Sequence, residues 1–228
     1  MKKLLALLSI TILSVFATAC DYENSITGLR FPADLQIHCT TFSINKSRGL
    51  WLTANHCVSN KQVYLVNGQE ATVFLFDDSN DVAILYAPKS HAQAMPFCNT
   101  PPEKGDDIFI SGHSYGWDER TYLTGIVAAP IIRIPDWTPN GDTYRRYMVF
   151  AVDGVAPGNS GSPVFKDKCG VISVLQSKDA YSGLSAGITW EALKTFTEGS
   201  WDRRSNVIEH VEVPSVPSVP HGDPNPTN

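Results

Sequence analysis

Short apolar runs between turn signals constrain this chain more than any other feature. About ten runs rich in β-branched and aromatic residues recur through the middle of the sequence, and most are too short for an ordinary helix. Asn67-Gly68 separates two of them, and both residues accept the positive φ of a tight hairpin. The pattern predicts an all-β fold, a sandwich or barrels. The runs are 35–44, 49–54, 62–66, 71–76, 81–87, 107–112, 121–134, 146–152, 162–165 and 169–177.

Helical spacing occurs in one place, near the end of the predicted domain. The stretch WEALKTFTEGSW, residues 190–201, has this spacing, and Thr189 before it suits an N-cap. The composition changes from Arg203 onward, where VPSVPSVP (213–220) lacks the apolar mass of a core. We therefore expect one terminal helix and then a flexible Pro-rich tail over 203–228, for which the alternative is a docking peptide.

The first twenty residues predict export. Lys2 and Lys3 precede an apolar stretch, and small residues follow before Cys20, as in a secretory signal peptide over residues 1–19. A cysteine directly after small residues resembles a bacterial lipoprotein signal, so Cys20 is a candidate for lipidation and membrane anchoring. The alternative is ordinary cleavage, with Cys20 as a spare thiol. Residues 20–32 are then expected to be a linker, and residues 33–202 one domain.

The charge balance excludes one class of partner. The full chain has a formal net charge of −5. Removing residues 1–19 removes two lysines and no acids, which makes the mature chain more negative by two. An acidic chain lacks the electrostatic footprint of a nucleic-acid-binding protein, and we expect a monomer without a nucleic-acid partner. Apart from Cys20 there are four cysteines, an even number suited to an oxidising compartment, and their spacing allows three pairings.

A histidine, an aspartate and a serine occur in contexts that suit nucleophilic catalysis. His56 follows a strand-like run in LWLTANHCV and neighbours Cys57, so a strand end and a disulfide could fix its ring. Asp81 directly precedes the apolar run VAILYA, where it can accept a hydrogen bond from His56 Nδ1. Ser160 lies in PGNSGSPVF. The amides of Gly158 and Ser160 could hold an oxyanion there, since glycine permits the required turn.

Two His-Cys pairs raise a metal alternative. His38-Cys39 and His56-Cys57 could be imagined as four zinc ligands. Neighbouring residues on a strand point to opposite faces, however, and zinc sites favour spaced ligands. We therefore expect no metal and no cofactor.

The three motifs, taken in order, resemble those of the chymotrypsin/trypsin-like serine peptidases. LTANHCV is similar to the histidine motif of that family, DVAIL to its aspartate motif and PGNSGSPV to its serine motif. The resemblance covers roughly residues 33–200. It implies two antiparallel β-barrels with the site between them and a C-terminal helix, and it implies hydrolysis of protein or peptide substrates.

Further residues carry over from this resemblance. Cys39 and Cys57 match the disulfide that braces the histidine loop, which leaves Cys98 and Cys169 as the second pair. Ser173 matches the buried serine that hydrogen-bonds the catalytic aspartate. The segment 170–175, with Val174 and Leu175, matches the strand that pairs with bound peptide, and GLSAGIT (183–189), beginning at Gly183, matches the far wall of the specificity pocket.

Three positions depart from the family pattern. Asn159 stands where the digestive members have the aspartate that binds a new N-terminal amine after zymogen cleavage, so we expect no such activation switch. Gly154 stands at the pocket base where trypsin-like specificity requires a carboxylate, and Asp153 is one residue further away. Leu175 stands where many members have glycine, which could narrow the pocket entrance. We expect a preference for small or medium apolar residues.

The sequence thus predicts an exported serine endopeptidase with His56, Asp81 and Ser160 as its catalytic residues. Two alternatives remain at this point. One is a peptidase-like binding module without turnover. The other is an interaction protein that acts through its Pro-rich tail.

Overall fold

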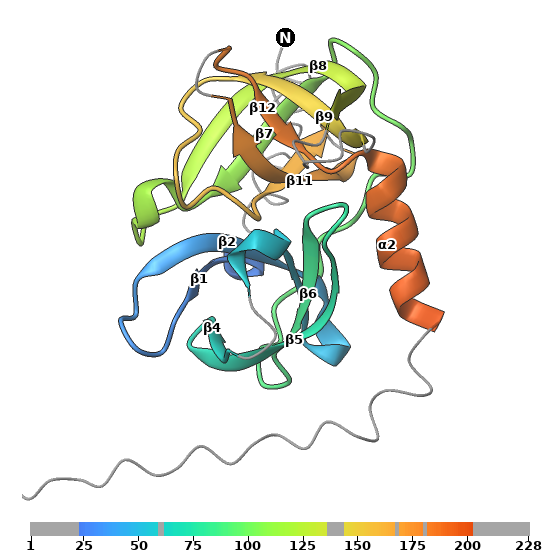
Figure 1. Ribbon diagram of the computed structural model, residues 1–228. Coiled ribbons are helices and arrows are strands. Elements are labelled where there is room, and N and C mark those ends of the chain that lie inside the picture. The colour runs from blue at the N-terminus through green and yellow to red at the C-terminus, as the bar shows by residue number, and fades with distance from the viewer. Residues whose placement is uncertain (1–22, 59–61, 136–143, 167–168, 180–181, 203–228) are drawn as a thin grey trace, which may run out of the picture.

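The chain folds into two stacked β-barrels flanked by one long helix, as the computed structural model shows (Figure 1). The structure describes residues 23–58, 62–135, 144–166, 169–179 and 182–202. The predicted signal peptide, Cys20 and the tail over 203–228 lie outside the described residues. No helix among the described residues is long and apolar enough to cross a membrane.

The first barrel is a closed antiparallel sheet in the order β1-β2-β3-β6-β5-β4. Asn67 and Gly68 both have positive φ in the turn between β4 and β5, which confirms the predicted hairpin. Its strands are β1 (Ile26–Arg30), β2 (Ile37–Asn45), β3 (Leu50–Thr53), β4 (Tyr64–Val66), β5 (Gln69–Asp77) and β6 (Val82–Tyr86).

The second barrel is closed in the order β10-β11-β12-β9-β8-β7. Its longest pair is the hairpin of β8 and β9, which curves through two register shifts. Its strands are β7 (Asp107–Gly112), β8 (Thr121–Pro135), β9 (Tyr144–Val152), β10 (Pro163–Lys166), β11 (Gly170–Lys178) and β12 (Ser185–Gly187). The predicted architecture of two antiparallel barrels is confirmed.

Three apolar clusters form the core of the molecule. One fills the first barrel around Trp51, and another fills the second around Phe150. The third lies between the barrels, where Phe42 and Ile84 of the first pack with Val174 of the second. Helix α2 (Trp190–Asp202) adds Leu193 to this shared cluster. The barrels therefore share a buried interface, which fixes the residues on either side of it relative to one another.

Helix α2 begins where the sequence predicted. The Ala192 amide donates to Thr189 Oγ1 at 3.4 Å, so Thr189 caps the first turn. In Figure 1 the helix runs down one side of the molecule, from the second barrel past the first.

Two strands were not predicted. Residues 20–32 were expected to be a linker, but Ile26–Arg30 form β1, which pairs with β2 and with β4 and so closes the first barrel. β12 lies in the segment 183–189, which was predicted only as a pocket wall, and it pairs with β11 and β9. Both strands are short, and β12 consists of Ser, Ala and Gly, so neither carries a strong strand signal.

Both expected disulfides are present. Cys39 and Cys57 join β2 to the short 3-10 helix η3 (Asn55–Cys57). Cys98 and Cys169 join the segment after the first barrel to the β10–β11 turn across 71 residues. The first bridge lies beside the predicted site and the second lies on the second barrel.

Candidate active site

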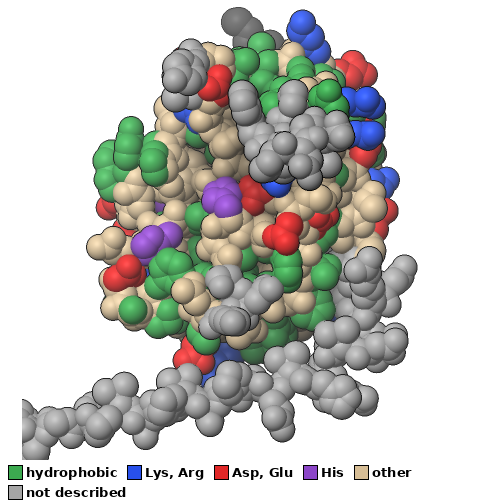
Figure 2. Space-filling model, in the orientation of Figure 1, with side chains coloured by type: hydrophobic (Ala, Val, Ile, Leu, Met, Phe, Trp, Pro, Cys, Tyr) green, Lys and Arg blue, Asp and Glu red, His purple; other side chains and the backbone are tan. Residues whose placement is uncertain are grey.

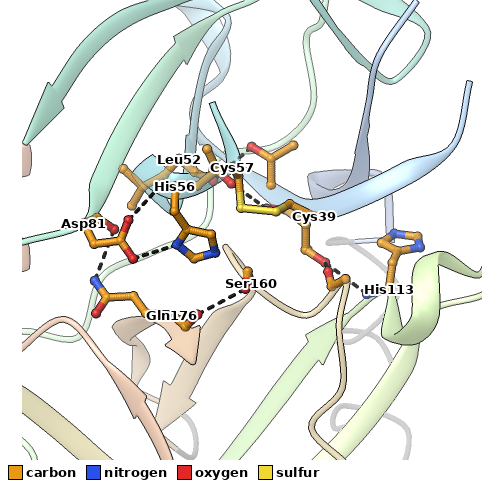
Figure 3. Close-up of a disulfide and its surroundings, with 12 residues drawn as sticks. Cys39, Leu52, His56, Cys57, Asp81, His113, Ser160 and Gln176 are labelled. Carbon is orange, nitrogen blue, oxygen red and sulfur yellow. Dashed lines mark hydrogen bonds and ion pairs between the residues drawn. A yellow bond between two sulfur atoms is a disulfide. The ribbon is translucent and has the colours of Figure 1, made fainter. Parts of the chain in front are cut away.

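His56 lies on η3, immediately after strand β3, and its backbone is held on both sides. Its neighbour Cys57 is tied to Cys39, and its amide donates to Asp81 Oδ1 at 2.8 Å. The ring nitrogen Nδ1 lies 2.7 Å from Asp81 Oδ2. With Nδ1–H donating to the carboxylate, Nε2 is the nitrogen that can accept a proton. Figure 3 shows the ring between Asp81 and Ser160.

Asp81 owes its position to a tight turn after β5. Its φ of +48° is unusual for a residue with a side chain. Asp77 builds the turn, because its carboxylate accepts hydrogen bonds from Ser79 and Asn80. Partial burial raises the pKa of Asp77, but these hydrogen bonds outweigh it and lower the pKa overall. Asp77 is therefore a structural member of the turn that carries Asp81.

Ser160 lies across the barrel interface from Asp81. Its hydroxyl donates to the Gln176 carbonyl at 3.1 Å, and its side chain lies near the His56 ring (Figure 3). The Ser160 carbonyl accepts from the Thr40 amide at 2.8 Å, so strand β2 of the first barrel holds the loop of the second. The structure brings His56, Asp81 and Ser160 together, although the hydroxyl–imidazole hydrogen bond is not formed. Such bonds are often long or misaligned before substrate binds.

Gly158, one of the two predicted oxyanion residues, has a backbone conformation that favours glycine. Gly158 has a φ of +93°, and a Cβ there would lie 2.1 Å from the His113 carbonyl oxygen. Only glycine therefore fits this close approach. Within the described residues, the Gly158 and Ser160 amides donate to no protein group. Two free amides on one tight loop form an arrangement that can stabilise a developing oxyanion.

Hydrogen bonds between uncharged groups hold the loop that carries Gly158 and Ser160. Asn159 is fully buried, and its Oδ1 accepts from the Ser114 hydroxyl at 2.7 Å and from the Ala156 amide at 3.1 Å. The Tyr115 amide donates to the Pro157 carbonyl at 2.6 Å. Ser114 and Tyr115 belong to the 3-10 segment η4 (Ser114–Gly116). No sequence motif indicated this support.

A buried histidine borders the same loop. His113 is 5% exposed, its Nδ1 hydrogen-bonds the Trp117 carbonyl at 2.9 Å, and its Nε2 has no partner within the described residues. Burial lowers the pKa of His113, and the charges of Arg120 and Arg30 lower it further against the opposing effects of the Trp117 carbonyl and Asp118. No motif in the sequence indicated a role for this histidine.

The expected support of Asp81 by Ser173 is wrong. Ser173 is fully buried and its hydroxyl donates to the Ile188 carbonyl at 2.6 Å. Gln176 lies there instead: its Nε2 donates to the carbonyls of Asn80 and Asp81 at 2.5 and 3.1 Å. The residue of β11 that faces Ser160 thus comes 16 residues after it, three later than the resemblance implied.

This displacement also changes the substrate-facing residues. Val174 and Leu175 belong to apolar clusters and are 0% and 1% exposed, so they cannot contact a substrate as predicted. The exposed end of β11 is Ser177 and Lys178. Beside it lies a groove of about 540 Å³, lined by four apolar or aromatic residues and Arg145 from β8 and β9, and by the end of β11 and the residues that follow it.

The remaining predicted pocket residues lie at exposed turns. Gly154 and Gly183 are exposed and have φ of +82° and +70°. Asp153, beside Gly154, is also exposed. Gly187, by contrast, is buried, and a Cβ there would lie 2.5 Å from Ser173 Oγ. The predicted segment 183–189 therefore combines an exposed loop with a closely packed strand.

The only cluster of potential metal ligands among the described residues is Cys39, His56 and Cys57, whose ligand atoms lie within 4.8 Å of one another. Both sulfurs are joined in the disulfide and are not thiolates. In the oxidised protein these two cysteines therefore brace the loop that carries His56. His38, the fourth residue of the zinc alternative, lies 3.1 Å from Asp34.

The site is open to solvent at the junction of the barrels. The side chain of His56 is 46% exposed and that of Asp81 is 20% exposed. Figure 2 shows histidine side chains at the surface of this face, at the level where the barrels meet. A polypeptide could therefore reach the imidazole without any rearrangement of the barrels.

Comparison with known proteins identifies relatives of this fold. The model of the trypsin-like peptidase domain family matches residues 39–174. Comparison with curated protein sequences finds no match.

Solved structures of two proteases are similar. An inactive form of M. tuberculosis Rv3671c carrying a serine-to-alanine mutation is 24% identical, with a TM-score of 0.64 over 78% of this chain and 88% of that one. The active form of the Rv3671c protease is 23% identical, with a TM-score of 0.64 over 80% and 82%. A serine endoprotease of Yersinia pestis is 18% identical, with a TM-score of 0.59 over 81% and 65%. These likenesses establish the fold.

Proposed function

Since this chain belongs to the trypsin-like peptidase family, we propose that it is an exported serine endopeptidase that uses His56, Asp81 and Ser160. The observation that carries the proposal is the hydrogen bond of His56 Nδ1 to Asp81, which leaves Nε2 toward Ser160. His56 takes the proton of the Ser160 hydroxyl as Oγ attacks the peptide carbonyl. It then gives that proton to the departing amine.

The amides of Gly158 and Ser160 stabilise the tetrahedral oxyanion. The resulting acyl-enzyme is hydrolysed by water, with His56 again acting as the base. No step needs a cofactor, and the substrates are proteins or peptides. The groove beside Ser177 and Lys178 is the candidate site for substrate side chains. Its apolar wall residues from β8 and β9 suit small or medium apolar side chains, although Arg145 and Asp179 also line it.

We propose that the enzyme needs no N-terminal zymogen cleavage. Neutral partners already hold Asn159. Ile26, in the stretch ITG that most resembles the new N-terminus of an activated digestive member, lies within β1 opposite Phe42. A new amine there would have to leave the barrel to reach the loop. Full activity of a protein with a residual N-terminal extension supports this proposal, and activity that appears only after trimming refutes it.

Export rests on the signal-like residues 1–19, and two disulfides suit an oxidising compartment. We propose that Cys20 becomes the lipidated first residue and anchors the protein to a membrane. Mass spectrometry of the mature N-terminus tests this directly. An unmodified Cys20, or an N-terminus elsewhere, would overturn it.

Labelling with a fluorophosphonate probe tests the catalytic proposal. We expect labelling of the wild type, and none of Ser160→Ala or His56→Ala. Ser162→Ala is the matched control, because Ser162 is a fully buried serine two residues away whose hydroxyl has no partner within the described residues. It should label like the wild type. A folded wild type that does not label would favour the binding module without turnover.

A further inference from the structure

Gln176 contacts both the turn that carries Asp81 and the hydroxyl of Ser160. The catalytic steps proposed above do not use its side chain. It lies near the end of β11, in the second barrel, and it is 5% exposed. Its side chain crosses to the first barrel, where Nε2 donates to the Asn80 and Asp81 carbonyls at 2.5 and 3.1 Å. Figure 3 shows its amide beneath Asp81. A long polar side chain is thus buried and both of its donors are used.

The two carbonyls flank the residue whose conformation orients the carboxylate. Asp81 has a φ of +48°, in the left-handed region that persists only where neighbouring structure holds it. Asp77 holds the turn through Ser79 and Asn80 on its outer side. Gln176 holds the same turn from the barrel interface. In this conformation both oxygens of Asp81 contact His56, one at its amide and one at Nδ1.

The backbone of Gln176 contacts the other partner. Its carbonyl accepts from the Ser160 hydroxyl at 3.1 Å. A single residue therefore touches the turn that carries Asp81 and the hydroxyl of Ser160, which lie in different barrels. Any shift between the barrels would move these contacts together.

We propose that Gln176 is a positioning residue that couples the two barrels, fixing the Asp81 carboxylate on His56 through its side-chain amide. This inference rests on the proposed peptidase function. Gln176 acts through Asp81 and does not itself touch the reacting atoms through its side chain. Loss of the amide should therefore reduce the rate of the chemical step and leave substrate binding unchanged.

The test compares Gln176→Met with Ser173→Ala. Methionine keeps the length and apolar packing of the side chain and the backbone carbonyl, but it cannot donate. We expect kcat to fall by about 10- to 100-fold, with KM changed less than about twofold, because misalignment of catalytic groups affects the chemical step. Ser173→Ala removes the buried hydroxyl that the family resemblance would have chosen, and it should leave kcat unchanged.

Two outcomes of this comparison overturn the inference. One is a Gln176→Met enzyme that folds and retains kcat. The other is an equal loss of kcat in both variants, which would indicate a general effect of altered β11 packing. Circular dichroism and urea denaturation establish that each variant is folded.

Proton NMR tests the inference without turnover. The low-field resonance of the His56 Nδ1 proton, shared with Asp81, should be lost or broadened in Gln176→Met and retained in Ser173→Ala. If the wild type is inactive, that result counts against the proposed peptidase function but not against the role of Gln176, because the NMR resonance still tests that role. If Gln176→Met does not fold, the wild type decides: its Gln176 Nε2 protons should exchange slowly with solvent, and rapid exchange would overturn the inference.

Discussion

Replacing Gly158 with alanine tests the proposed oxyanion role of its amide separately from the proposed roles of His56, Asp81 and Ser160. Gly158 has a φ of +93°, and a Cβ on it would lie 2.1 Å from the His113 carbonyl oxygen and 2.9 Å from the Gly116 amide nitrogen. A carbon–oxygen contact normally needs about 3.3 Å or more. The methyl group must therefore move against backbone atoms by roughly 1 Å, and neither neighbour is a flexible side chain.

The expected loss of kcat depends on the displacement of the Gly158 amide. If Gly158 N–H leaves the oxyanion position, one of two donors is lost, which typically lowers kcat by about 10²- to 10³-fold, or about 3–4 kcal/mol. The left-handed conformation adds a folding cost of roughly 1–2 kcal/mol for a residue with a Cβ. We therefore expect Gly158→Ala to lose both activity and stability, with most of the loss in kcat.

Gly68→Ala is the control for the backbone effect alone. Gly68 has a φ of +72° in the β4–β5 hairpin, and a Cβ there meets nothing within 4 Å. It should cost about 1–2 kcal/mol of stability and leave kcat unchanged. The assays are urea denaturation and steady-state hydrolysis of a chromogenic ester. If Gly158→Ala retained kcat within about threefold, which is far less than the usual cost of losing an oxyanion donor, the assignment of this amide would be wrong.

Three further predictions follow from the support around the site. Burial lowers the pKa of His113, so on acidification the unfolded chain takes up this proton before the folded chain does. The stability of the protein should therefore fall as pH drops below about 6.5, and His113→Gln should flatten this dependence in denaturation measured from about pH 7 to 5. Asn159→Asp places a carboxylate among neutral partners, so its folded pKa should rise and its stability should be lost as pH increases above about 4, which pH-dependent unfolding would detect. Removing the Cys98–Cys169 bridge, which spans 71 residues, should cost about 4 kcal/mol in urea denaturation by loop entropy while kcat stays the same; a large loss of kcat would contradict its placement as purely structural.

The features that could be predicted correctly from the sequence are those that a few adjacent residues determine. The Asn67-Gly68 turn, the helix after Thr189 and the three motifs around His56, Asp81 and Ser160 each depend on a few adjacent residues. The order of the three motifs along the chain matches that of a known family, and this resemblance implied the two-barrel fold. The strands β1 and β12 were missed for the opposite reason. Their few residues gain stability from partners on both sides rather than from their own propensity.

The errors around Ser173 have one origin, the unknown number of residues between Ser160 and the part of β11 that lies beside it. Counting from Ser160 assumes how many residues separate the nucleophile loop from the strand that returns beside it, and no motif fixes that number. Once β11 is displaced by three residues, Val174 and Leu175 face apolar clusters and Gln176 faces the site. One signal in the sequence could have indicated this residue: in VISVLQSK, residues 171–178, Gln176 directly follows the apolar run and is its first long polar side chain. Its partners, 95 and 96 residues away, follow only from the way the barrels pack.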